Sequence, residues 1–221
     1  MKYMIRKTPS DFNVDAMPGK SVWNKADAAP IASYVWARPA DPPRPDAEAR
    51  LLYTSTQLYV RFEVRSPTVI ARALKPNELV CLDSCVEFFV APDGINYLNF
   101  ETNCVGTLLL WIGPDRNNRR IVDLADAAMV KIATTLPRGS AIPEATPAPG
   151  DGWRVEYSIP FDLLAKYTGR PAPESGTIWR ANFYYCADNL PPAPQWGSWN
   201  PVNCPAPDFH RPEYFGELQF E

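Results

Sequence analysis

The sequence contains one histidine, no excess of positive charge and no long apolar run. Lysine and arginine number 22 against 25 acidic residues, which gives a formal net charge of −3. Without a basic surface, nucleic acids and anionic membranes are not expected partners. No apolar stretch approaches the roughly 18 residues that a membrane-spanning helix needs. The first residues, MKYMIRKTPSDF, lack the apolar stretch of a signal peptide. We therefore expect a protein that is either cytoplasmic or secreted with its signal removed.

Several enzyme motifs are missing too. The chain has no GxSxG nucleophile elbow, no P-loop and no dinucleotide-binding glycine motif. One histidine and no zinc-type cysteine spacing argue against a transition-metal enzyme. We expect the cysteines to be small buried apolar residues, although one disulfide stays open because sequence alone cannot pair them. They are Cys81, Cys85, Cys104, Cys186 and Cys204.

Proline is abundant, with 25 residues, and it is clustered. Because proline is excluded from central strands and helix interiors, each cluster predicts a loop. The clusters lie at residues 39–45, 137–149, 171–173, 191–194 and 201–212. Apolar residues make up 46% of the chain, enough for a sizeable core, and no loop is long enough to be a domain linker. We expect one domain over residues 1–221.

Between these loops the chain alternates with period two. In QLYVRFEV (57–64) the apolar residues share one face while Tyr59, Arg61 and Glu63 share the other, which predicts a half-buried strand. Two hairpins are expected. The first joins the strand ARLLYT to the strand 57–64, and the second joins 84–90 to 96–103 through the turn APDGI. Only PFDLLAKY (160–167) has a helical pattern. The pattern predicts an all-β, antiparallel β-sandwich with one short helix. The other expected strands are 31–37, 84–90, 96–103, 107–112, 129–135, 153–159, 178–186 and 214–220.

Polar residues interrupt three of these apolar strands. If the strands are neighbours, one sheet face carries carboxylates and amides beside aromatic rings, which is the chemistry that binds sugar hydroxyls and stacks on a sugar ring. The alternative is an ordinary solvated sheet face. The residues concerned are Glu87, Glu101, Asn103, Asn182 and Tyr184.

The C-terminal segment, residues 195–216, gathers aromatic residues on loops stiffened by proline. Such loops lose little entropy on clamping a ligand, so Trp196, Trp199, Phe209 and His210 are candidate binding residues. Alternatively, Trp196 and Trp199 cap the core. His210 is open between three roles: a pocket wall, a structural residue, and a ligand of haem or metal.

Five motifs in order resemble the carbohydrate-binding module family 9-like group of the DOMON-like superfamily. They are DSCVEFF, YLNFETNCVG, WRVEYSIPFDLL, GTIWRANFYYCAD and WNPVNCPAPDFHRPEYFGELQF. The resemblance covers roughly residues 50–220. It implies a jelly-roll-like sandwich of two antiparallel sheets with a sugar site. It also implies structural calcium in many members, for which the loops 91–94 and 123–126 are the candidate oxygen donors.

The resemblance also assigns residues. Glu87 takes the place of a sugar-binding glutamate, and Glu101 replaces an arginine two residues before Asn103. Asn182 matches another binding asparagine, with Tyr184 two residues on. Of the two aromatic rings that clamp the sugar, one corresponds to Phe209. The other falls on Cys81, which cannot stack, so Trp111, Trp196 and Trp199 are the candidate replacements.

The expected function is non-catalytic binding of plant-type oligo- or polysaccharides, or of their ends, of the xylan or cellulose kind. A partner glycoside hydrolase is a further expectation. One alternative is a glycoside hydrolase that uses Glu87 and Glu101 as paired carboxylates. Another is a haem-binding DOMON domain with His210 and Met129, since Met129 is the only methionine on an expected core strand.

Overall fold

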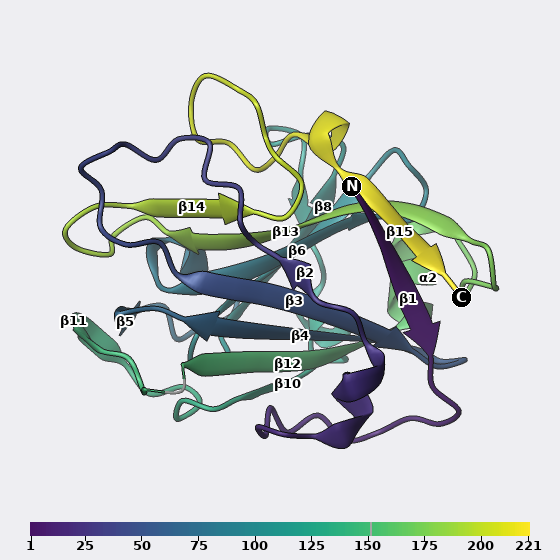
Figure 1. Ribbon diagram of the computed structural model, residues 1–221. Helices are drawn as coiled ribbons and strands as arrows, with labels where there is room; N and C mark the ends of the chain where they lie inside the picture. The colour runs from purple at the N-terminus through teal and green to yellow at the C-terminus, as the bar shows by residue number, and fades with distance from the viewer. Residues whose placement is uncertain (151) are drawn as a thin grey trace.

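The computed structural model describes residues 1–150 and 152–221, and it is an all-β sandwich (Figure 1). A curled 13-stranded sheet runs in the order β10-β12-β4-β3-β1-β15-β13-β6-β7-β8-β9, with β14 added to β13 and β2 to β3. The strands are β1 (Lys2–Lys7), β2 (Ala29–Pro30), β3 (Asp46–Tyr53), β4 (Gln57–Arg65), β5 (Thr68–Ala71), β6 (Cys85–Ala91), β7 (Tyr97–Asn103), β8 (Leu108–Gly113), β9 (Arg120–Ile121), β10 (Lys131–Thr134), β11 (Ile142–Pro147), β12 (Trp153–Pro160), β13 (Ile178–Ala187), β14 (Gln195–Ser198) and β15 (Gly216–Phe220).

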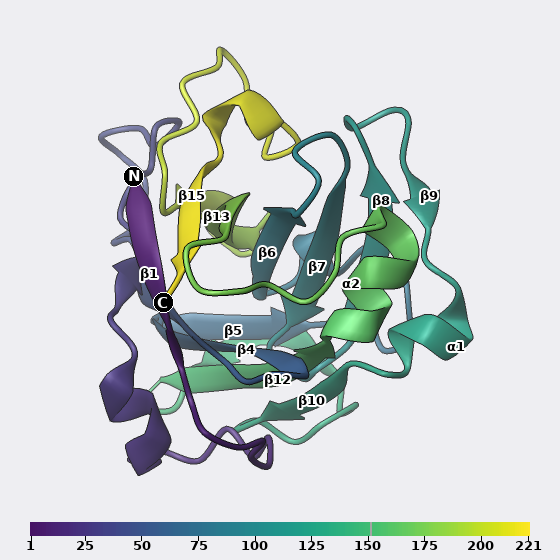
Figure 2. The ribbon, with the colours of Figure 1, turned by 90° about the vertical axis from the view of Figure 1, so that its right-hand side faces the viewer.

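Strand β1 joins the two layers of the sandwich. Its residues 2–5 pair in parallel with β15, and its residues 6 and 7 pair in parallel with β3. The strands from β3 to β10 thus form one layer and those from β15 to β9 the other, and Figure 2 shows the layers crossing at a large angle. The remaining pairings of the large sheet are antiparallel, as predicted, and these two parallel pairings are the exception.

Aromatic side chains from both layers fill the space between them. The Phe183 ring (β13) lies 5.3 Å from Phe88 (β6) and 6.2 Å from Phe62 (β4). Phe100 (β7) stacks on Tyr157 (β12) at 6.3 Å. These rings are all at most 1% exposed. Because strand side chains alternate between faces, placing these residues inward turns Glu87 and Glu101 to the outer face of their layer.

Most of the expected strands are confirmed to within a residue or two, as is the helix, α2 (Phe161–Thr168). The strand expected at 31–37 is wrong, because only β2 and an isolated bridge between Ser33 and Ser198 form there. The strand expected at 129–135 begins at Lys131, so Met129 lies in a turn and is 40% exposed. The loop expected at 137–149 contains β11, which pairs with β5. Proline is tolerated there because β11 is an edge strand.

The helical elements are short. Besides α2 there are α1 (Leu124–Ala127) and the 3-10 turns η1 (Ser21–Lys25), η2 (Val80–Leu82) and η3 (Pro212–Tyr214). Proline at the start of α2 and a left-handed Gly169 at its end set its bounds. Within the residues described, none of these helices is long and apolar enough to cross a membrane.

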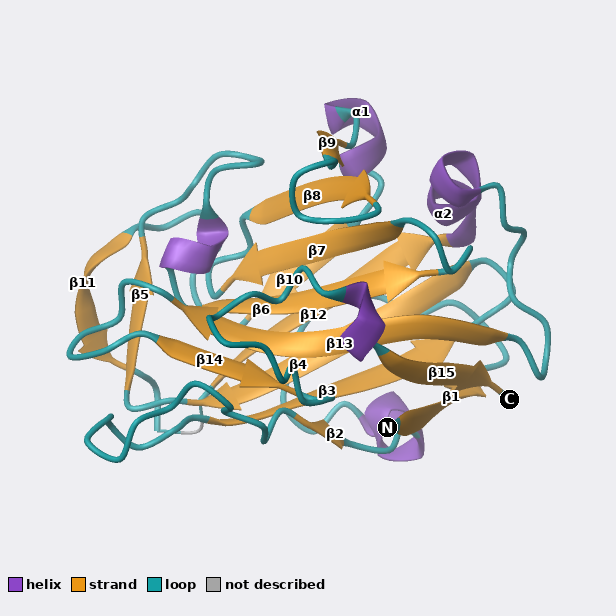
Figure 3. Ribbon diagram, turned by 90° about the horizontal axis from the view of Figure 1, so that it is seen from above, coloured by secondary structure: helices purple, strands orange, loops and turns teal. Residues whose placement is uncertain are grey.

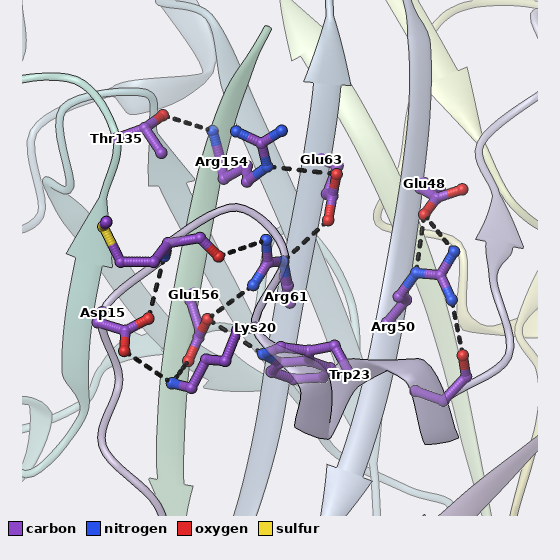
Figure 4. Close-up of polar contacts among 12 residues, drawn as sticks. Asp15, Lys20, Trp23, Glu48, Arg50, Arg61, Glu63, Thr135, Arg154 and Glu156 are labelled. Carbon is purple, nitrogen blue, oxygen red and sulfur yellow. Dashed lines mark hydrogen bonds and ion pairs between the residues drawn. The ribbon is translucent and has the colours of Figure 1, made fainter. Parts of the chain in front are cut away.

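Strand β4 is buried on both faces, which corrects the expectation of a half-buried strand. The N-terminal segment, through η1, covers its outer face (Figure 4). There the buried Glu156 carboxylate accepts hydrogen bonds from Lys20 (2.9 Å), Trp23 Nε1 (3.1 Å) and Arg61 (3.3 Å). Arg61 is 1% exposed and Phe12 stacks on Tyr59 at 3.8 Å. The polar face is therefore an internal ion-pair network.

All five cysteines are free thiols, so the disulfide left open by the sequence does not form. Cys81 is half-buried and the other four are buried, as expected of small apolar residues.

Candidate functional site

A pocket of about 320 Å³ lies on the outer face of the layer that contains β13, β6, β7 and β8. Figure 3 shows these strands side by side, with the loops of the C-terminal segment passing over them. The walls combine acidic, basic and aromatic side chains, a mixture that small polar ligands require. The lining residues are Leu79, Cys81, Glu87, Glu101, Leu109, Trp111, Arg116, Arg119, Cys186, Asp188, Trp196, Pro207, Asp208, Phe209 and His210.

Glu87 and Glu101 face each other across neighbouring strands. They are direct partners in the antiparallel register of β6 and β7, a relationship that places Cβ atoms about 5 Å apart. Glu87 is 2% exposed and Glu101 is 4% exposed, and both line the pocket. The sheet thus builds a pair of buried carboxylates into one wall.

The two carboxylates have few compensating partners. Glu101 accepts a hydrogen bond from Asn99 Nδ2 (2.8 Å), and Arg119 Nη1 lies 4.0 Å from its Oε1. For Glu87, among the described residues, no nitrogen or hydroxyl donates to the carboxylate; the nearby Cys186 thiol donates to the Cys81 carbonyl and to Asp188, each at 3.5 Å. Desolvation, together with the charge of Glu101 and Asp188, raises the pKa of Glu87 well above its usual range. Burial raises the pKa of Glu101 to about 7, opposed by Asn99 and Arg119.

Aromatic rings also line the pocket. Phe209 stacks on Tyr184 with ring centroids 4.1 Å apart, and the Tyr184 hydroxyl donates to the Phe209 carbonyl at 3.2 Å. Trp196 is half-buried, and its Nε1 donates to Asp188 Oδ1 at 2.6 Å. Trp111 also lines the pocket, and its buried Nε1 has no hydrogen-bond partner within the part of the chain that the structure describes. Rings from three separate strands and loops therefore bound one polar cavity.

His210 lines the pocket and also has a structural contact. Its Nδ1 lies 3.0 Å from the Tyr97 hydroxyl, and its ring stacks on Phe89 at 5.0 Å. Burial, together with the positive charge of Arg119 and Arg116, lowers the pKa of His210 to about 2, so the imidazole is neutral. Met129, the methionine considered with it for haem, does not line this pocket.

Arg116 and Arg119 were not predicted from the sequence. They lie in the loop between β8 and β9, which the chain folds back over β7. Arg116 pairs with Asp208 at 3.0 Å, and the Arg119 guanidinium lies 5.4 Å from the centre of the Trp111 ring. The only signal in the sequence is the basic run RNNRR, which by itself reads as an exposed turn.

Four of the predicted residues do not line the pocket. The Asn103 amide donates to the Ala73 carbonyl and to Asp83, each at 2.8 Å. The Asn182 amide donates to the Asn200 carbonyl at 2.9 Å. Trp199 lies in the core against Phe183, at 5.4 Å, and over Gly216, where a Cβ would come within 2.5 Å of its ring. Tyr184 lies behind Phe209. The predicted residues that do line it are Glu87, Glu101, Trp196, Phe209 and His210.

In the two loops considered for calcium, the carboxylates accept hydrogen bonds from protein groups. Asp93 accepts hydrogen bonds from the backbone of Ile95 and Asn96, and Asp123 caps α1 through Ala125. Asp126 binds Lys166 and Tyr167. No group of three or more His, Cys, Asp or Glu side chains capable of holding a metal occurs among the residues described. These loops do not fit a calcium ion.

The sequence model of carbohydrate-binding family 9 matches residues 15–220. The chain belongs to carbohydrate-binding family 9. A search of curated proteins gives no match to it.

Solved structures of family 9 type resemble the whole chain. A candidate carbohydrate-binding protein from Bacteroides uniformis is 29% identical, with a TM-score of 0.84 over 100% of this chain and 99% of that one. A family 9 module from Caldicellulosiruptor kristjanssonii, in complex with cellotriose, is 17% identical with a TM-score of 0.67, covering 100% and 94% of the two chains. A family 9 module from the same organism, in complex with glucose, is 19% identical with a TM-score of 0.66, covering 99% of this chain and 95% of that one. At these identities the latter two establish the fold.

The family 9 match begins at residue 15, so it includes the segment that covers β4 as well as the strands of the pocket. A further cavity of about 400 Å³ lies between the loop after β7 and helix α1, but its lining is mainly apolar and carries one charged side chain, Arg138. The pocket at Glu87 and Glu101 combines buried carboxylates with aromatic rings, and the apolar cavity has no acidic side chain among the described residues of its lining.

Proposed function

We propose that this protein is a non-catalytic carbohydrate-binding protein that holds its ligand in the pocket between Glu87, Glu101, Trp196 and Phe209. The observation that carries the proposal is the pairing of buried carboxylates with aromatic rings across one cavity. Sugars have hydroxyl groups at the ring edge and an apolar C–H face, so they need both kinds of contact at once.

Each wall has a separate role in this proposal. The Glu87 and Glu101 carboxylates accept hydrogen bonds from neighbouring hydroxyls, while Arg119 and the unpartnered Trp111 Nε1 donate to ring or hydroxyl oxygens. Trp196 and the exposed edge of Phe209, which is 6% exposed, contact the apolar sugar face. Trp196 takes over the stacking place that Cys81 cannot fill. Asn103, Asn182, Tyr184 and Trp199 act indirectly, by fixing the strands and loops that carry the contact residues.

Short glucose- or xylose-based chains, or the ends of such chains, are the proposed ligands. The volume of about 320 Å³ is at the lower end of the range of roughly 300–1,000 Å³ found for small-molecule pockets. A pocket of this size suits a chain end better than the middle of a long polymer. The structural neighbours in complex with cellotriose and with glucose support the same class. A partner glycoside hydrolase is part of the proposal, because a binding protein without catalysis assists an enzyme that has it.

A glycoside hydrolase is the second candidate, favoured by one observation: two buried carboxyl groups, one with its pKa raised to about 7. Hydrolysis requires carboxyl groups that flank the scissile bond. Glu87 and Glu101 instead stand on adjacent strands of one wall, so the arrangement favours binding. Release of a chromogenic leaving group by the wild type, abolished in both Glu87→Gln and Glu101→Gln, would favour catalysis.

Titration calorimetry with glucose, cellotriose, xylose and xylotriose tests the binding function. We expect saturable binding by the wild type and at least about tenfold weaker binding by Phe209→Ala and Glu87→Gln, since one charge-assisted hydrogen bond is worth about 1.5–3 kcal/mol. Glu144→Gln, on the exposed strand β11, is the matched control and should bind as the wild type does. The proposal is wrong if no glycan of a broad panel binds, or if neither pocket variant weakens binding.

A further inference from the structure

In the part of the chain that the structure describes, the acidic pair has no cation beside Glu87, a feature that a neutral sugar does not explain. The pocket is lined by the acids Glu87, Glu101, Asp188 and Asp208 and by the bases Arg116 and Arg119, with His210 neutral. Arg116 is taken by Asp208 at 3.0 Å. Arg119 lies 4.0 Å from Glu101 and over the ring of Trp111. The pocket is therefore lined by more acidic than basic side chains.

Glu87 is the least compensated of these groups. It is 2% exposed, lines the cavity, and among the described residues has no cationic partner. An ionised carboxylate buried in this way is costly unless a cation accompanies it. Asp188, the nearest further acid on that side, already accepts from Trp196. The wall thus presents two carboxylates, side by side across the β6–β7 ladder, to whatever occupies the pocket.

From this juxtaposition we propose that the pocket selects a sugar bearing a free amino group, whose ammonium is held between the Glu87 and Glu101 carboxylates. The proposal rests on the carbohydrate-binding function proposed above and names the ligand class of that same pocket. An ammonium has three N–H donors, enough to reach both carboxylates and to keep one for another acceptor. The rest of the sugar keeps the contacts with Trp196 and Phe209.

The acid at position 101 is opposite Glu87 in the β6–β7 register, and this determines the chemistry of the wall. A basic residue beside Glu87 would neutralise it within the protein and leave a site for neutral hydroxyl groups. Glu101 instead doubles the negative charge, so the ligand must supply the compensation. Both carboxyls are already buried, so a cationic ligand supplies the counter-charge that lets them ionise, whereas a neutral ligand does not.

Three monosaccharides that differ at one carbon atom make the test. Glucosamine, glucose and N-acetylglucosamine carry an ammonium, a hydroxyl and a neutral amide there. We expect titration calorimetry at pH 7.5 to show glucosamine binding at least about tenfold more tightly than glucose, and N-acetylglucosamine no better than glucose. Glu101→Gln should bring the glucosamine affinity to within about threefold of that for glucose, while Glu144→Gln should retain the preference.

A second readout needs no variant. Because burial holds a proton on the acidic pair near neutral pH, a bound ammonium should displace it, and the binding heat should change with the ionisation enthalpy of the buffer. Glucose should show no such change. The other titratable or charged groups facing the pair are Cys81, Cys85, Cys186, Asp188, Arg116, Arg119 and His210.

The possible outcomes distinguish the amino-sugar proposal from the carbohydrate-binding function on which it rests. Binding of glucose or cellotriose through Phe209, with no preference for glucosamine, overturns the amino-sugar proposal and leaves the carbohydrate-binding function intact. A glucosamine preference that survives both Glu87→Gln and Glu101→Gln also overturns it. The absence of binding by any of these sugars overturns both proposals.

Discussion

The Tyr184 ring stacks on the Phe209 ring, with centroids 4.1 Å apart and planes inclined by 14°, and its hydroxyl donates to the Phe209 carbonyl at 3.2 Å. A strand residue thereby fixes both the side chain and the backbone of a loop residue. Because the loop between β14 and β15 contains several prolines, few such contacts are needed to hold it in one conformation.

Substitution of Tyr184 should weaken ligand binding without touching the ligand. Tyr184→Leu loses the stack, worth about 0.5–1.5 kcal/mol, and the hydrogen bond to the loop. We expect about a three- to tenfold loss of sugar affinity, measured by calorimetry on protein whose fold is checked by circular dichroism. Tyr184→Phe keeps the stack on Phe209, so its loss of sugar-binding free energy should be less than half of the loss in Tyr184→Leu. Equal affinities for wild type and Tyr184→Leu would show that Phe209 needs no support.

The acidic pair should make the protein more stable as the pH falls from 8 to 5. The pKa of Glu101 is raised to about 7 in the folded state, so the folded protein binds more protons than the unfolded chain between the two pKa values. The free energy of unfolding therefore rises as the pH falls from 7 to 4.5 and decreases again as the pH rises. The change is roughly 3 kcal/mol for a pKa shift of this size.

Urea unfolding of the wild type and of Glu101→Gln from pH 5 to pH 8 measures this contribution. Glutamine imitates the protonated acid, so the variant should lack most of the loss of stability that the wild type shows as the pH rises from 5 to 7. Parallel curves for the two proteins would mean that Glu101 is not responsible.

His210 should make the folded protein less stable as the pH falls below 6.5, which is the opposite of the effect of Glu101. The pKa of its buried ring is lowered to about 2, whereas the unfolded chain takes up a proton near 6.5. Its contribution is thus present above pH 6.5 and is lost as the pH falls below it, by roughly 1–2 kcal/mol at pH 5. His210→Gln, which can still bond to Tyr97, should lose less stability than the wild type between pH 6.5 and pH 5. A larger loss in the variant would contradict a neutral His210.

The ion-pair network beneath the N-terminal segment predicts a large stability effect far from the pocket. Glu156→Leu removes the buried carboxylate that Arg61 and Lys20 share and leaves Arg61 with Glu63 alone, at 2.9 Å. Removing one member of a buried pair costs about 3–5 kcal/mol, and we expect the lower end of this range because Glu63 remains. Chemical denaturation should show this loss. Glu217→Ala, which breaks only an exposed pair with Lys2, should change stability by less than about 1 kcal/mol. Similar values for the two variants would place the stabilisation elsewhere in the segment.

The local pattern of the chain was sufficient for most of the fold. Alternation in 57–64, 84–90 and 178–186 predicted strands because the hydrophobic effect sorts each strand into two faces. The alternation pattern failed where strand formation depends on the presence of a pairing partner. Residues 31–37 have strand-like composition, yet their only β-bridge is the isolated one at Ser33. In contrast, β11 forms within a proline cluster because it pairs with the edge of β5. The outer face of β4 is polar in sequence but buried, since a distant segment folds over it.

For the site, the sequence by itself determined that Glu87, Glu101 and Phe209 stand among alternating strands and stiff loops. Only the tertiary structure decided that Glu87 and Glu101 oppose each other, that Arg119 lies 4.0 Å from Glu101, and that Asn103 and Asn182 hold backbone instead. The physical reason is that face and periodicity are local properties of a strand. Register, loop placement and the competition for hydrogen-bond partners depend on residues far apart in the chain.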